Sequence, residues 1–299
     1  SDPALGLQRA PALAWFAGDA VHTSVLLAGR IAGLGAPTTV GADSQGRIDV
    51  DGLARALAVH DGPAVVALQA GDVHSGAFDD FTAAVAVARA HDAWVHVDGA
   101  FGLWAAVSPR LGHLVEGLSE ADSWATDAHK TLNVPYDCGV AIVRDEAAMT
   151  ASLGAHAAYL PAVASVSDPY DRVPELSRRA RGVPVWAALR SLGRRGVIDL
   201  VDGLVDAATA LADGFRALPG LEVLNDVVFT QVCLAARDDA DTAALGEWLR
   251  DEGTVWASSS TWQGRTVVRF AVSNHATDAE DVRRTVDAVA RGAAALGIR

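Results

Sequence analysis

The chain contains almost no lysine. Of its 24 basic residues, 23 are arginine and one is a lysine, Lys130. Arginine stays protonated in proteins, whereas a lysine that is desolvated or placed near other cations loses its proton and becomes a nucleophilic amine. Such an amine forms Schiff bases with carbonyl compounds. Lys130 is therefore a candidate functional residue, although a single lysine can also fall at its position by chance.

Cysteine and positive charge are also scarce. The two cysteines, Cys138 and Cys233, lie in apolar stretches, which favours buried thiols in a reducing compartment over a disulfide framework. No Cys/His spacing resembles a zinc site. The formal net charge is −13, and no basic stripe offsets it, so we expect neither nucleic acid nor a membrane as a partner. No apolar run is long enough to span a bilayer, and the first residues, 1–4, lack the basic head of a signal peptide, so a cytoplasmic protein is expected.

The residues that are present indicate a folded globular protein. Apolar residues make up 51% of the chain and charged residues 20%. Buried strands are predicted over residues 63–71, 93–98 and 138–144, and a helix over 79–92, begun by Asp79 and Asp80 as caps. Apolar strands separated by helices predict an α/β fold with a mostly parallel sheet sandwiched by helices. Ligands of such sheets gather at the carboxyl ends of the strands.

The pattern changes after residue 160. Residues 160–174 contain three prolines and are predicted to form a long loop, a feature that is often functional. The elements predicted beyond it are helices over 184–195 and 201–218, strands over 221–225 and 228–236, a helix over 242–251, a strand over 266–273 and a helix over 278–296. These elements predict a large domain over residues 1–196, which includes a linker helix, and a small α+β C-terminal domain over residues 197–299.

Two residues of complementary chemistry follow predicted strands. Asp98 ends the strand 93–98, and Lys130 comes 32 residues later, after one further helix and strand. A buried carboxylate needs a cationic partner, such as the ring nitrogen of pyridoxal 5'-phosphate, unless Asp98 simply caps the following turn. In such a site the lysine makes a Schiff base with the cofactor, and the carboxylate keeps the ring nitrogen protonated. The spacing therefore predicts a site for this cofactor.

Four segments resemble the group II pyridoxal-phosphate-dependent amino acid decarboxylases. They are Val21–Val25, Ala70–Asp79, His96–Ala100 and Asp122–Lys130, and the similarity continues through Asp137–Gly139 and residues 269–274. The resemblance implies the fold of aspartate aminotransferase, known as fold type I, with pyridoxal 5'-phosphate as the cofactor. It also implies a carboxy-lyase of amino acid metabolism that acts on an L-amino acid as a homodimer.

The resemblance assigns further residues to the cofactor site. His22 would stack on the cofactor ring, and Ala100, Thr126 and His129 would lie around the cofactor, with His129 beside its phosphate. Asp72 would lie near the phenolic oxygen, where the family favours a small neutral residue. Taken without the family, His22 is a residue that begins a helix, and His129 is equally well explained as a structural histidine.

Two residues are implied for the substrate. Arg269 would bind the substrate carboxylate, a task that suits a bidentate guanidinium, unless it is one of many arginines on a sheet surface. Tyr170, in the long loop, would protonate the substrate carbon after carbon dioxide leaves. The cluster of Arg178, Arg179 and Arg181 resembles an arginine cluster of the family, without an assigned ligand.

The chain departs from the family at two places. Asp127 stands where the family often has asparagine, and because its charge would repel a phosphate we expect it to lie outside direct contact with the cofactor. No Ser/Gly/Thr-rich turn for the phosphate precedes His22, so the chain resembles a member without its N-terminal segment and is expected to bind cofactor weakly. Three functions remain open: a decarboxylase, an aminotransferase or other carbon–carbon lyase on the same fold, and an inactive, truncated relative.

Overall fold

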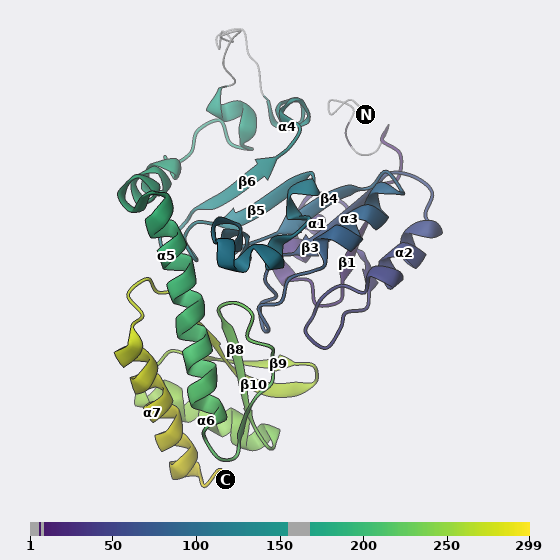
Figure 1. The fold of residues 1–299 in the computed structure, drawn as a ribbon. Helices are drawn as coiled ribbons and strands as arrows, with labels where there is room; N and C mark the ends of the chain where they lie inside the picture. The colour runs from purple at the N-terminus through teal and green to yellow at the C-terminus, as the bar shows by residue number, and fades with distance from the viewer. Residues whose placement is uncertain (1–5, 7–8, 155–167) are drawn as a thin grey trace.

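Two β-sheets organise the chain, one in each half (Figure 1). The structure is a computed structural model that describes residues 6, 9–154 and 168–299. The first sheet has the strand order β2-β1-β3-β4-β5-β6, and all neighbouring strands are parallel except β6, which is antiparallel to β5. Its strands are β1 (Ala14–Gly18), β2 (Thr38–Val40), β3 (Ala64–Gln69), β4 (Trp94–Asp98), β5 (Ser123–Asp127) and β6 (Gly139–Val143). The predicted mostly parallel sheet is confirmed.

Helices cover both faces of this sheet. Val95 and Val97 of β4 are fully buried on one face, against Leu53 of α2 and Phe81 of α3. On the other face, Trp15 and neighbouring apolar residues pack against α1. The helices of this half are α1 (Thr23–Ile31), α2 (Val50–Ala58), α3 (Phe81–Arg89) and α4 (Glu146–Leu153), with short 3-10 helices η3 (Gly102–Val107), η4 (Pro109–Val115), η5 (Leu118–Glu120) and η6 (Pro169–Arg172). Because strand side chains alternate, Trp94, His96 and Asp98 point away from the Val95 face.

The second sheet is antiparallel, with the order β7-β8-β10-β9. Its elements are β7 (Leu221–Val223), β8 (Gln231–Ala236), α6 (Asp239–Glu252), β9 (Ser258–Trp262), β10 (Arg265–Ala271) and α7 (Ala279–Leu296). Strand β9 escapes sequence prediction because its Ser-rich sequence lacks apolar alternation. A tight turn joins it to β10, with Gln263 and Gly264 both at positive φ, as a two-residue hairpin of type I′ requires.

Two helical segments, labelled together as α5 (Gly182–Arg216), connect the two sheets. A kink at Gly193, where φ is 62° and ψ is −179°, separates them, so the two predicted helices are confirmed and their boundary lies at Gly193. Only glycine adopts this backbone conformation without strain, which explains where the helix bends. Val201 and Val205 pack into the core of the first sheet, and Phe215 packs into the core of the second. The predicted domain boundary at 196/197 lies inside this helix.

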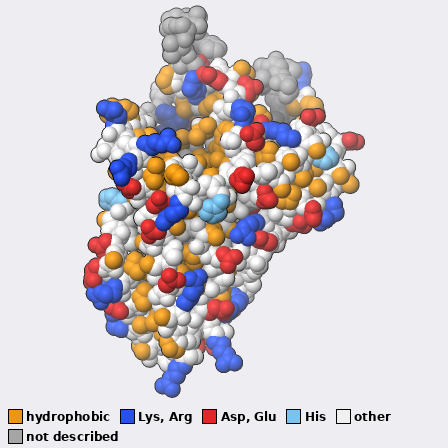
Figure 2. Space-filling model, in the orientation of Figure 1, with side chains coloured by type: hydrophobic (Ala, Val, Ile, Leu, Met, Phe, Trp, Pro, Cys, Tyr) orange, Lys and Arg blue, Asp and Glu red, His pale blue; other side chains and the backbone are white. Residues whose placement is uncertain are grey.

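Both cysteines are free and buried, as the sequence predicts. Burial raises the pKa of the Cys233 thiol to about 12, so it stays protonated at neutral pH. Within the described ranges, no helix is both long and apolar enough to cross a membrane. Acidic and basic side chains are interspersed over the face of the molecule drawn in Figure 2.

Candidate functional site

The predicted site residues follow four parallel strands of the first sheet. His22 comes after β1 and Asp72 after β3, while Asp98 and Asp127 are the last residues of β4 and β5. Gln69 at the end of β3 pairs with Asp98, and Asp98 pairs with Ala125 in β5. Because these strands are parallel, their carboxyl ends lie at one edge of the sheet, where such folds bind ligands.

Lys130 lies in a turn that directly follows β5. Its backbone N–H donates to the carbonyl oxygen of Asp127 at 3.1 Å. Its side-chain Nζ lies 2.9 Å from Oδ2 of Asp127, and both side chains are half-buried. Asp127, which the sequence analysis places outside direct contact with the cofactor, therefore holds the amine of the single lysine in a charge-assisted hydrogen bond.

Asp98 combines the two roles that the sequence left open. Its Oδ1 accepts a hydrogen bond from the N–H of Ala100 at 3.1 Å, so it caps the turn after β4. Its Oδ2 accepts no hydrogen bond from any described residue, and the side chain is only half-buried. The carbonyl of Ala100 in turn accepts from the N–H of Asp127 at 2.8 Å and from Oγ1 of Thr126 at 3.4 Å. The ends of β4 and β5 are thereby tied together.

His129 is fixed by contacts with the segment before β6. The N–H of Cys138 donates to Nδ1 of His129 at 3.0 Å, and the ring lies 4.0 Å from that of Tyr136. The same Nδ1 lies 3.1 Å from the carbonyl oxygen of Cys138, so the backbone of Cys138 holds this side of the ring. The other ring nitrogen, Nε2, lies 3.8 Å from Oδ2 of Asp127. His129 therefore borders the Lys130–Asp127 pair and is held by backbone, which serves the structural and the cofactor hypotheses alike.

His22 and Asp72 border a cleft of about 580 Å³. His22 is the N-cap of α1, since its Nδ1 accepts from the N–H of Ser24 at 3.2 Å. Asp72 is 2% exposed, and its Oδ1 accepts from the N–H groups of His74 and Ser75, each at 2.8 Å. Asp72, the carboxylate that departs from the family pattern, thus stabilises the turn formed by residues 72–75.

Arg269 is placed in the centre of the second sheet, between β8 and β9. Its Nη1 donates to the carbonyl oxygen of Val73 at 2.8 Å and to Oε1 of Gln231 at 3.1 Å. His74, which the sequence analysis did not assign, joins this group because its Nε2 lies 2.8 Å from Oγ of Ser260. Burial lowers the pKa of His74, so its imidazole is neutral at physiological pH. Its position two residues after Asp72 in the same motif was the available signal.

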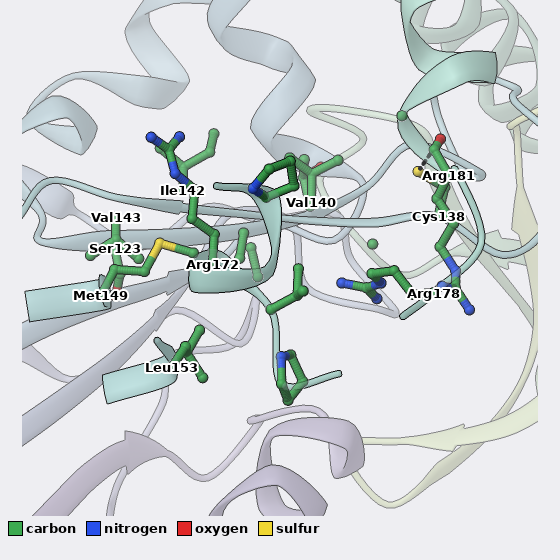
Figure 3. A pocket seen from close by; sticks show the side chains of 18 of the residues that line it. Ser123, Cys138, Val140, Ile142, Val143, Met149, Leu153, Arg172, Arg178 and Arg181 are labelled. Carbon is green, nitrogen blue, oxygen red and sulfur yellow. Dashed lines mark hydrogen bonds between the residues drawn. The ribbon is translucent and has the colours of Figure 1, made fainter. Parts of the chain in front are cut away.

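Tyr170 lies apart from Lys130. It belongs to η6, and its hydroxyl donates to Oδ2 of Asp168 at 3.1 Å. It borders a larger cavity of about 1940 Å³, which Thr126 and Asp127 also line. Figure 3 shows this cavity, with Val140 and Ile142 of β6 and with Arg172, Arg178 and Arg181 around it. No contact joins Tyr170 to Lys130 among the described residues, and residues 160–167 of the predicted loop lie outside them.

Comparisons with known proteins agree on one family. Residues 8–237 match the pyridoxal-dependent decarboxylase conserved domain. Tryptophan decarboxylase 1 of Oryza sativa is 30% identical over 308 residues, covering 95% of this chain and 59% of the rice enzyme. Cysteine sulfinic acid decarboxylase of Mus musculus is 28% identical, covering 76% of this chain and 48% of the mouse enzyme. The chain thus spans about half the length of the curated relatives it matches.

A solved structure extends the likeness to three dimensions. The crystal structure of Oryza sativa TDC with PLP and tryptamine has a TM-score of 0.90 and 26% identity. The match covers 99% of this chain and 66% of that one.

Among the described residues, no group of three or more His, Cys, Asp or Glu side chains is arranged to hold a metal ion.

Proposed function

The chain belongs to the pyridoxal-dependent decarboxylase family, and we propose that it decarboxylates an L-amino acid with pyridoxal 5'-phosphate held at Lys130. One observation carries this proposal. The only lysine of the chain lies in the turn after β5, beside the strand that ends in Asp98, and Oδ2 of Asp98 has no partner among the described residues. An amine and an available carboxylate at one sheet edge are what this cofactor needs.

The residues at this edge fit the cofactor. Lys130 would hold the cofactor through its amine, and Oδ2 of Asp98, which has no described donor, would accept a hydrogen bond from the protonated ring nitrogen. The imidazole of His22, held by its cap on α1, offers a flat face for the ring. Ala100, Thr126 and His129 lie next to the turn that carries Lys130. Asp72 orders the turn after β3 by accepting from the N–H groups of His74 and Ser75. When bound, the cofactor supplies the electron sink that accepts the electron pair of the broken carboxylate bond.

Two further residues are proposed to act on the substrate. Arg269 uses only Nη1 toward described residues, so its Nε and Nη2 remain able to bind a substrate carboxylate in bidentate fashion. Tyr170 is proposed to protonate the substrate carbon. Partial burial and then the neighbouring Asp168 raise the pKa of Tyr170, so its phenol keeps the proton that it would donate.

The proposed active form is a cytoplasmic homodimer whose sites lie near the subunit interface, with a large domain over 1–196 and a small one over 197–299. The first turns of α5 support the interface. Val183, Trp186 and Leu189 are 61%, 65% and 41% exposed. Their spacing of three residues places them on one face of the helix, and an exposed apolar stripe of this kind indicates a protein contact.

Carboxyl-labelled amino acids test the function directly. With pyridoxal 5'-phosphate present, labelled carbon dioxide should be released from at least one member of a panel of aromatic, acidic and basic L-amino acids. Lys130→Arg keeps the positive charge and should abolish release, because arginine cannot form the Schiff base. If no member releases carbon dioxide but a keto acid accepts the amino group, the aminotransferase hypothesis replaces this one. If the chain binds the cofactor and does neither, it is another lyase, and if it does not bind it, an inactive relative.

A further inference from the structure

The side chains of Lys130 and Asp127 form an ion pair, and the proposed function assigns no role to Asp127. Their side-chain atoms Nζ and Oδ2 lie 2.9 Å apart, within hydrogen-bond distance. The backbone of Asp127 is fixed on both sides, since its N–H donates to Ala100 O at 2.8 Å and its carbonyl accepts from Lys130 N at 3.1 Å. The carboxylate of Asp127 is therefore held next to Nζ of Lys130, the atom that would react with an aldehyde.

Asp127 is also the group best able to take a proton from this amine. Among the described residues, no other carboxylate lies within 4.0 Å of Nζ. The Nδ1 of the nearby His129 is held by the backbone of Cys138, and no contact joins this ring to Nζ of Lys130 among the described residues. The ammonium of Lys130 must lose a proton before it can attack a carbonyl carbon.

We propose that Asp127 is the proton shuttle for Schiff-base formation at Lys130, an inference that rests on the proposed function. Asp127 Oδ2 accepts one proton from the ammonium. The free amine then adds its electron pair to the aldehyde carbon, forming the N–C bond, and a proton moves from nitrogen to the former carbonyl oxygen.

The second half of the cycle returns the proton. The protonated Asp127 donates to the new hydroxyl, the C–O bond breaks and water leaves. The products are a protonated Schiff base and one water molecule, formed from one ammonium and one aldehyde, with Asp127 again a carboxylate. No oxidant or reductant takes part, and the shuttle also serves the reverse reaction, in which the lysine is released.

The experiment measures how fast Lys130 is captured, independently of turnover. The chain is mixed with pyridoxal 5'-phosphate, samples are trapped with borohydride over time, and peptides are quantified by mass spectrometry. Because Lys130 is the only lysine, all side-chain label falls on one peptide. The α-amino group of Ser1 reports the intrinsic reactivity of the aldehyde in the same sample.

The variants isolate the carboxylate. Asp127→Asn should slow labelling of Lys130 about tenfold, less than the full value of general acid–base catalysis because water reaches this half-exposed site. Labelling of Ser1 should not change. Asp127→Glu, which keeps a carboxylate, should recover part of the rate. The control is Asp213→Asn, because Asp213 also pairs at 2.9 Å with a basic residue three positions on, Arg216. It should leave the rate unaltered.

The outcomes distinguish failure of the proton-shuttle proposal from failure of the proposed function on which it rests. If Asp127→Asn labels Lys130 as fast as the unaltered chain, or faster, the carboxylate merely holds the ammonium and the shuttle is wrong. If the Asn and Glu variants are slowed alike while their circular dichroism is native, the effect is structural and the shuttle is again wrong. If the unaltered chain is labelled only at Ser1, the proposed function itself fails, and the shuttle with it.

Discussion

Two groups of carboxylates at the same sheet edge differ in how fully they are satisfied. The buried group, Asp72 and Asp79, is 2% and 6% exposed, and each carboxylate accepts at least two backbone N–H groups. The open group, Asp98 and Asp127 with Lys130, is half-buried. One oxygen of Asp98 has no described donor, and Asp127 holds the amine of Lys130 that we propose to react. The two groups therefore differ in how much of their hydrogen-bonding capacity is left for a ligand.

The difference follows from where the hydrogen-bond donors come from. Asp79 accepts from Ile48 N at 2.8 Å and from Gln69 N at 2.6 Å, which ties together segments far apart in the sequence. Ser75, beside Asp72, accepts through its carbonyl a hydrogen bond from Asn225 at 2.9 Å and so links the first sheet region to the second half of the chain. A carboxylate saturated by backbone stabilises the fold, and one left open is available to a ligand.

The largest expected effect concerns pH and the buried group. Burial raises the pKa of Asp79 from 3.8 to about 7, against the opposing hydrogen bonds from Ile48 and Gln69. Between these values the folded protein holds a proton that the unfolded chain has lost, so the free energy of unfolding falls as pH rises. About three pKa units correspond to about 4 kcal/mol, present below about pH 4 and lost by about pH 7.

Urea unfolding at a series of pH values tests this effect. The difference in free energy of unfolding between the unaltered chain and Asp79→Asn should depend on pH between about 4 and 7, because asparagine does not titrate. The other titrating groups are common to both chains and cancel in the difference. Equal pH dependence in the two chains would show that Asp79 is charged when folded.

The next largest effect should appear in the open group. Asp98→Asn removes the charge that we propose to pair with the ring nitrogen, and losing such a hydrogen bond costs about 1.5–3 kcal/mol, or about 10- to 100-fold in cofactor affinity. The thermal midpoint without cofactor should change little, since asparagine can still accept from Ala100 N. Titration by fluorescence and by melting checks both statements. Unchanged affinity would remove Asp98 from the site.

Asp72→Asn should lower stability and leave cofactor capture nearly unchanged, the reverse of Asp98→Asn, and the change in free energy should be smaller. The amide keeps one acceptor for the N–H groups of His74 and Ser75 but loses the charge, which should lower the free energy of unfolding by about 1.5 kcal/mol. The rate at which Lys130 captures pyridoxal 5'-phosphate should stay within a small factor. A large loss of capture with little loss of stability would place Asp72 in the open group and end the distinction.

The sequence predicts the open group better than the buried one. Apolar runs locate the parallel strands, and the spacing of Asp98 and Lys130 along them places both at strand ends. By contrast, Asp79 and Asp80 look equivalent as helix caps. Asp80 does cap α3 by accepting from Ala83 N, whereas Asp79 is buried and accepts from Ile48, 31 residues away. A partner that distant leaves no local pattern.

Contacts between segments distant in the sequence explain the other features that the sequence analysis did not predict. The contact of Asp127 with Lys130 depends on the turn after β5, and the tilted ring contact of His129 with Tyr136 depends on the path of the segment before β6. The charge of Asp127 was visible in the sequence, and its partner was not. The same holds for the kink in α5, since the residues on both sides of Gly193 have helical sequences and only the backbone conformation locates the break there.

The smallest expected effect belongs to a residue that we place in both categories. His22 caps α1 through Nδ1 and is proposed to stack on the cofactor through its ring. His22→Asn keeps a good N-cap and loses the ring, so stability should hold while cofactor affinity falls. His22→Phe keeps a flat ring and loses the cap, so the free energy of unfolding should drop by about 1 kcal/mol while affinity is largely retained. Urea unfolding and fluorescence titration of both variants separate the two roles. If the two variants lose affinity equally, the ring does not stack on the cofactor and His22 is a cap alone.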